Sequence, residues 1–118
     1  MDKFDIEKIE KIIHDRKLAN EKFVSKKSKV YKIFTDLNNQ AFQNGSLTQM
    51  EKELIALGIS VVINCESCMQ HHIEKALKAG ATEDQIIEVL EVAIEMGGGP
   101  ATVSCRFALK VLDYYYKK

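Results

Sequence analysis

The segment from Leu54 to Ile63 is the strongest constraint on the fold, because as a helix it carries apolar residues on nearly every side. It follows Thr48-Gln49-Met50-Glu51, in which Thr48 and a glutamate three residues later form a capping box that starts a helix. Val61 to Ile63 could also form a strand, but the capping box and the length of the segment favour a helix. A helix that is apolar on all sides is buried, so we expect it at the centre of the fold.

The same periodicity predicts helices along most of the chain. Apolar residues recur at helical spacing, and stop signals such as Asn44-Gly45-Ser46 and the run from Gly97 to Pro100 separate the segments. The pattern predicts helices over residues 4–18, about 20–42, 48–63, 65–78, 82–94 and 100–116. We therefore expect an all-α helical bundle of about six helices.

Length and charge narrow the function classes. The 118 residues suit one domain, in which residues 1–45 form N-terminal helices and residues 48–112 the core that carries the motifs. Basic and acidic residues both number 17, so no charge excess favours nucleic acid or a membrane surface. No apolar run approaches the roughly 20 residues that span a bilayer. The N-terminus lacks the apolar core of a signal peptide, and we expect a cytoplasmic protein.

A fully apolar helix also carries more apolar surface than so small a domain can cover by itself. A chain of this size buries only a limited share of its surface, and apolar helix faces that exceed the core meet another subunit. We therefore expect a homo-oligomer.

The sequence Cys65-Glu66-Ser67-Cys68 opens a predicted helix, and His72 follows one turn later. On a helical wheel His72 falls between the two cysteines, whereas His71 lies outside that wedge and is expected to face solvent. The positive end of a helix favours a thiolate at Cys65, and His72 can act as a base for Cys68. The pair can therefore cycle between dithiol and disulfide, although which cysteine attacks first stays open.

Glu53 is a carboxylate in an unusual position. It shares a helical stripe with Leu57, Ser60 and Asn64, and that stripe ends next to Cys65. A buried glutamate normally has a partner or a task, and accepting a proton from His72 is the natural one. The alternative is that Glu53 only complements the helix dipole and faces solvent.

These residues resemble the signature of the carboxymuconolactone decarboxylase superfamily. The resemblance runs through Glu53 to Ser60, the CxxC motif, His72 and Gly80-Ala81-Thr82, and the cysteine pair is similar to its alkylhydroperoxidase D-like branch. It implies thiol-dependent reduction of hydroperoxides or disulfides by an oxidoreductase, with Glu53, Cys65, Cys68 and His72 as catalytic residues. It also implies a thiol reductant and a trimer or hexamer. We expect no resident cofactor or metal.

Three alternatives remain open at this stage. Cys65, Cys68 and His72, with Cys105 as a fourth ligand, could bind zinc. The chain could instead be a non-catalytic redox-sensing oligomer, or an acid–base enzyme of the decarboxylase type that uses Glu53 and His72 alone. Cys105 itself is expected to be a buried core thiol.

Overall fold

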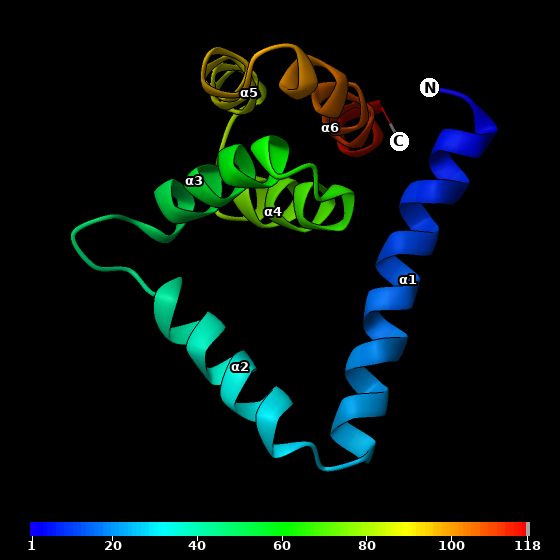
Figure 1. Ribbon diagram of the computed structural model, residues 1–118, viewed down its shortest axis with the longest axis vertical. Helices are drawn as coiled ribbons and strands as arrows, with labels where there is room; N and C mark the ends of the chain where they lie inside the picture. Colours follow the sequence, from blue (N-terminus) through cyan, green and yellow to red (C-terminus); the bar gives the residue numbers. More distant parts are fainter. Residues whose placement is uncertain (118) are drawn as a thin grey trace.

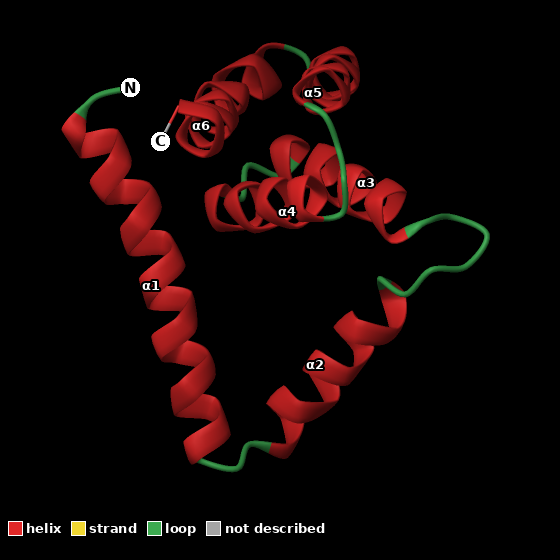
Figure 2. Cartoon of the chain, turned by 180° about the vertical axis from the view of Figure 1, so that it is seen from behind, coloured by secondary structure: helices red, strands yellow, loops and turns green. Residues whose placement is uncertain are grey.

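The computed structural model describes residues 1–117, and within that part of the chain it contains six helices and no strand (Figures 1 and 2). The helices are α1 (Lys3–Ser25), α2 (Lys29–Ala41), α3 (Gln49–Val62), α4 (Glu66–Lys78), α5 (Glu83–Gly97) and α6 (Gly99–Lys117). The all-α prediction is confirmed. None of the described helices combines the length and apolar character needed to cross a membrane.

Helices α3 to α6 pack together, and α1 and α2 form a V that extends from this bundle (Figure 1). The core contains buried apolar side chains from α3 to α6, and Ile9 of α1 joins it. Both predicted capping boxes are present, with Thr48 capping α3 and Thr82 capping α5. The α3–α4 pair places the carboxylate, the cysteines and the histidine of the predicted site on neighbouring helices.

The boundary between the first two helices differs from the prediction. Helix α1 continues to Ser25, and the break falls at Lys26 to Ser28 rather than near residue 19. Lys27 adopts a positive φ of 55°, and the Ser28 hydroxyl caps α2 by accepting the Tyr31 N–H at 3.1 Å. The sequence pattern carried no glycine or proline at this point, so periodicity alone placed the break too early.

Helix α3 is not buried on all sides, which corrects the first expectation. Its inner stripe of Glu53, Leu57, Ser60 and Val61 is buried, but Ile55 and Ile59 are 51% and 56% exposed. Together with Val92 and Met96 of α5, these side chains line an open apolar groove. The core of one chain is too small to cover both faces of α3.

The glycines from Gly97 to Gly99 allow the end of α5 to lie close to the start of α6 and the chain to turn sharply between them. A Cβ added at Gly97 would lie 2.8 Å from the Ala101 Cβ. Gly98, between α5 and α6, has φ 67° and ψ −149°, a region that residues with a Cβ essentially avoid.

Replacing Gly98 by alanine should therefore destabilise the fold by about 2 kcal/mol, because the α5–α6 turn would hold a strained residue. Gly99→Ala is the matched control, since Gly99 has no positive φ and a Cβ there meets nothing within 4 Å. Urea denaturation of both variants measures the difference. Equal stability of the two variants would contradict this account of the turn.

Candidate redox site

The turn between α3 and α4 brings the site together. Asn64 has a positive φ of 56° and ends α3, and the Cys65 N–H donates to the Ser60 carbonyl at 2.9 Å. The Asn64 side-chain oxygen accepts a 3.0 Å hydrogen bond from the Ser104 hydroxyl of α6. The chain direction therefore reverses at a defined point, directly before the first cysteine.

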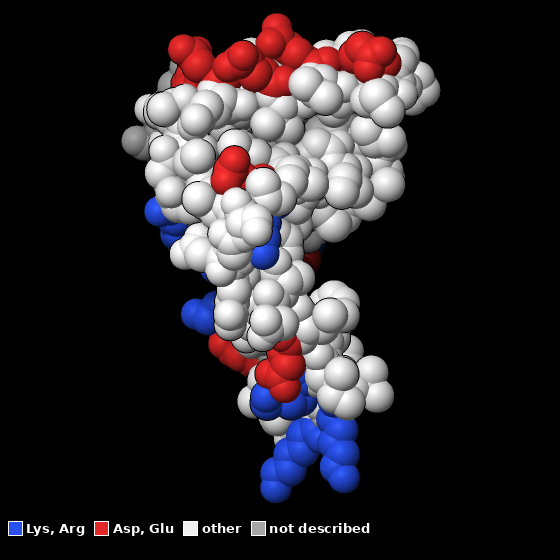
Figure 3. Space-filling model, turned by 90° about the vertical axis from the view of Figure 1, so that its left-hand side faces the viewer, with Lys and Arg blue, Asp and Glu red and all other residues white. Residues whose placement is uncertain are grey.

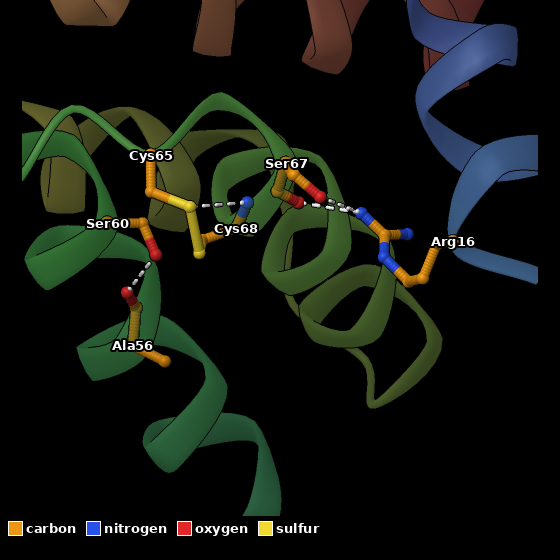
Figure 4. Close-up of a disulfide and its surroundings, with 6 residues drawn as sticks. All are labelled: Arg16, Ala56, Ser60, Cys65, Ser67 and Cys68. Carbon is orange, nitrogen blue, oxygen red and sulfur yellow. Dashed lines mark hydrogen bonds between the residues drawn. A yellow bond between two sulfur atoms is a disulfide. The ribbon is translucent and has the colours of Figure 1, made fainter. Parts of the chain in front are cut away.

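Cys65 and Cys68 form a disulfide at the start of α4, with their Cα atoms 5.2 Å apart (Figure 4). Cys65 is the N-cap residue of α4, one position before the first helical residue. Its sulfur accepts the Cys68 backbone N–H at 3.2 Å. Both cysteines are half-buried. The helix N-terminus thus lies against the Cys65 sulfur, where a negative charge is favoured.

Glu53 and His72 form the second half of the site. His72 Nδ1 and Glu53 Oε1 share a hydrogen bond of 2.7 Å, between side chains that are 16% and 4% exposed. The ring of Phe42 stacks on His72 with 5.5 Å between centroids. The alternative in which Glu53 faces solvent is wrong, because the carboxylate is buried and has a partner. With Glu53 ionised, Nδ1 donates and Nε2 is left to exchange a proton.

His72 lies one helical turn after Cys68, as the spacing predicted. Within the described residues the hydrogen bonds include none between the imidazole and a cysteine sulfur. The disulfide and the Glu53–His72 pair are therefore two adjacent units on α3 and α4. In apo sites the hydrogen bonds between such groups are often long and shorten only in the complex with substrate.

A polar hollow of about 380 Å³ adjoins the Glu53–His72 pair. Side-chain amides of α2 and of the loop before α3 form most of its rim, and Lys75 adds a cation. Its lining residues are Asn38, Asn39, Phe42, Gln43, Asn44, Gln49, Glu53, His71, His72 and Lys75. The hollow is large enough for water or a small polar molecule to reach the Glu53–His72 pair.

His71 is half-buried beside this hollow, rather than facing solvent as expected. Burial, with added repulsion from His72 and Arg16, lowers the pKa of His71 from 6.5 to about 4. Unfolding restores the ordinary value, so the unfolded chain binds the extra proton between those two pH values. Acidification through that window therefore takes stability away from the fold.

Cys105 is separate from the pair. Its side chain is 4% exposed in α6, and burial raises the pKa of its thiol. The expectation of a buried core thiol is confirmed. Among residues 1–117, no three or more His, Cys, Asp and Glu side chains are grouped to hold a metal ion, so Cys105 does not complete the zinc ligand set considered above.

Sequence reasoning missed the contribution of α1. Arg16 reaches Ser67, which lies between the two cysteines, although 51 positions separate them in the chain. Lys8 pairs with Glu66 at 2.9 Å. A lone arginine on an amphipathic helix carries no local signal for such a contact, because only the docking of α1 on α4 creates it.

The fold and the site together define an all-α protein with a CxxC disulfide beside a buried carboxylate–histidine pair. The model of the carboxymuconolactone decarboxylase family matches residues 28–111, well over half of the chain, and the chain belongs to that family. The match begins at Ser28, so it includes α2 and extends further toward the N-terminus than the motifs indicated.

Relatives and solved structures agree with this assignment. An uncharacterised protein of Cupriavidus necator is 42% identical over 82 residues, which cover 70% of each chain. A carboxymuconolactone decarboxylase family protein of Legionella pneumophila, solved in the apo form, is 30% identical with a TM-score of 0.81, covering 93% of this chain and 96% of that one. A family member from Thermotoga maritima, for which a role in the antioxidative response has been suggested, is 29% identical with a TM-score of 0.82 and 91% coverage of both chains.

Proposed function

We propose that this protein is a cytoplasmic thiol-dependent oxidoreductase of the alkylhydroperoxidase D-like branch, which reduces hydroperoxides or disulfides with Cys65 and Cys68. One observation carries the proposal: the two cysteines are close enough to be bonded at a helix N-terminus, beside the Glu53–His72 pair. A redox-active dithiol needs this proximity together with a nearby proton acceptor. The suggested antioxidative role of the Thermotoga maritima relative supports it.

The first step is attack of one cysteine thiolate on the terminal oxygen of a hydroperoxide. The O–O bond breaks, the cysteine becomes a sulfenic acid, and the leaving alkoxide takes a proton to become an alcohol. The second thiol then attacks the sulfenic sulfur, which releases water and forms the Cys65–Cys68 disulfide. The Glu53–His72 pair accepts the thiol proton and supplies the proton of the leaving group. With a disulfide substrate, the same thiols act by exchange.

The cycle requires an external thiol donor, which reduces the Cys65–Cys68 disulfide through a mixed disulfide. Both cysteines are half-buried rather than fully enclosed, so the donor can reach the disulfide from solvent. The donor is a small thiol or a reductant protein.

Peptide mapping by mass spectrometry tests the proposal directly. One equivalent of an organic hydroperoxide is added to fully reduced protein, and buried Cys105 serves as the internal control. Rapid formation of a Cys65–Cys68 disulfide, with alcohol released in equal amount and Cys105 unchanged, is the expected result. Three unmodified thiols after this treatment, and after treatment with a small-molecule disulfide, would refute it.

We further propose that a second copy of this chain covers the apolar groove of α3 and α5. Helix α2 has no buried residue, and it exposes Val30, Ile33, Phe34 and Leu37, so one copy offers an apolar helix and another a groove. Charge also matches: α5 carries only acidic charges, whereas lysines gather at the opposite tip near the α1–α2 turn (Figure 3).

Light scattering should accordingly find an oligomer, a trimer or hexamer as the family resemblance implies, at micromolar concentration. Ile59→Asp should dissociate it, because a charge would be buried in the groove. Asp36→Ala, a change at an exposed position of α2 outside the apolar stripe, is the control. A monomeric parent protein would exclude this assembly.

A further inference from the structure

Two residues lie between the cysteines, and α1 binds both of them. Lys8 pairs with Glu66 at 2.9 Å. The Arg16 Nη2 atom donates to the Ser67 carbonyl at 2.7 Å and to the Ser67 hydroxyl at 2.9 Å (Figure 4). The first turn of α4 is therefore held from outside as well as by its own helical bonds.

The other Arg16 nitrogen anchors the guanidinium in a buried network. Nη1 donates to the Gln70 side-chain oxygen at 2.6 Å, and Gln70 is fully buried. The Gln70 amide donates to the Tyr115 hydroxyl at 2.7 Å, which in turn donates to Glu74 at 2.6 Å. No buried side-chain nitrogen or oxygen of the described residues lacks a partner. Loss of Arg16 would leave the buried Gln70 side-chain oxygen without this donor, and an unpaired buried acceptor destabilises the folded state.

The two contacts from α1 differ in strength. Both members of the Lys8–Glu66 pair are about half exposed, and such pairs contribute little. The planar guanidinium of Arg16 instead makes three bonds at once to α4, a geometry that a lysine ammonium does not reproduce. Arg16 is therefore the residue that fixes α1 to this turn.

We propose that Arg16 is a positioning residue for the redox pair: it holds Ser67 so that the Cys68 amide stays directed at the Cys65 sulfur, and it places a fixed cation beside that turn. The proposal rests on the dithiol function proposed above. The amide and the cation both favour the Cys65 thiolate, so they act in the same direction. Other titratable groups at α4 include Lys8, Glu53 and Tyr115 of neighbouring helices, and Glu66, His71, His72, Glu74, Lys75 and Lys78 of α4 itself. Arg16 supplies the two side-chain hydrogen bonds to Ser67 described above.

Alkylation by iodoacetamide tests this role. The reduced full-length protein is alkylated across a pH range of about 5 to 10, and mass spectrometry measures the reaction of each cysteine separately. Arg16→Gln should raise the pH midpoint for Cys65 and so reduce its thiolate fraction at neutral pH by about threefold to tenfold. Lys110→Gln is the matched control, because it also removes one cation and frees α1 from α6 at Asp5; its charge acts on Glu66 of α4, but its ion pair is with Asp5 rather than with Ser67. The readout is independent of any peroxidase activity, so it remains informative if the proposed function fails.

An unchanged midpoint in Arg16→Gln, or an equal shift in Lys110→Gln, would overturn the proposal. Arg16→Lys should raise the pH midpoint of Cys65 less than Arg16→Gln does, since the lysine ammonium can still reach Ser67. Ser67→Ala provides a second route if Arg16→Gln does not fold, because it removes only the hydroxyl acceptor. It should move the midpoint in the same direction by a smaller amount, and no movement in folded Ser67→Ala would also count against the role of Arg16.

Discussion

Cys65→Ser and Cys68→Ser should each lower hydroperoxide turnover about a hundredfold or more, because a serine hydroxyl does not ionise near neutral pH and cannot close the disulfide. The two variants should differ in what accumulates. Loss of the attacking cysteine leaves the peroxide unconsumed, whereas loss of the resolving cysteine allows one equivalent to react and leaves a sulfenic acid. Steady-state turnover with a dithiol donor, followed by mass spectrometry of each variant, measures both effects.

Cys105→Ser is the matched control, since Cys105 is buried in α6 away from the pair. It should keep normal turnover in the fraction that folds. Full activity in either Cys65→Ser or Cys68→Ser would rule out the dithiol mechanism. It would favour instead the acid–base reaction in which Glu53 and His72 act alone.

The second large effect is expected at Glu53. Glu53→Gln should slow turnover about tenfold to a hundredfold, because an amide still accepts the His72 hydrogen bond but cannot take up a proton. The side chain keeps its shape and its 2.7 Å partner, so the thermal unfolding temperature should change little. The dependence of turnover on pH should change as well, since a group that carries the proton has been removed.

Glu51→Gln separates this effect from a general weakening of α3. Glu51 lies two residues earlier and closes the capping box by accepting the Thr48 N–H at 2.8 Å, a bond that glutamine also makes. Its turnover should equal that of the parent protein. A Glu53→Gln variant with unchanged turnover and pH profile would remove the carboxylate from the proposed proton relay.

Most of the helices could be predicted from the sequence because their signals are local. The capping boxes at Thr48 and Thr82 lie within four residues of each helix start, and the CxxC spacing with His72 one turn later follows from helical geometry. The burial of Glu53 was also predictable, since it shares a stripe with Leu57 and Ser60. Features that depend on contacts between distant segments of the chain were predicted less well.

The exposure of α3 illustrates that difference. Its composition shows that both faces are apolar, but which face meets the core is decided by the packing of α4, α5 and α6 against it. The same holds for the burial of His71, because residues of α2 and of the following loop form the polar hollow that it adjoins. Periodicity describes one helix at a time and contains no information about its neighbours.

Local sequence thus determined most of the helices, the spacing of the cysteine pair and the candidates for proton transfer, because caps, spacing and side-chain chemistry act over a few residues. Only the tertiary structure decided that Glu53 contacts His72 and that Arg16 holds the residue between the cysteines. Those contacts join residues 19 and 51 positions apart. They exist because burying the apolar stripes of the helices brings distant polar side chains together, and each must then find a partner.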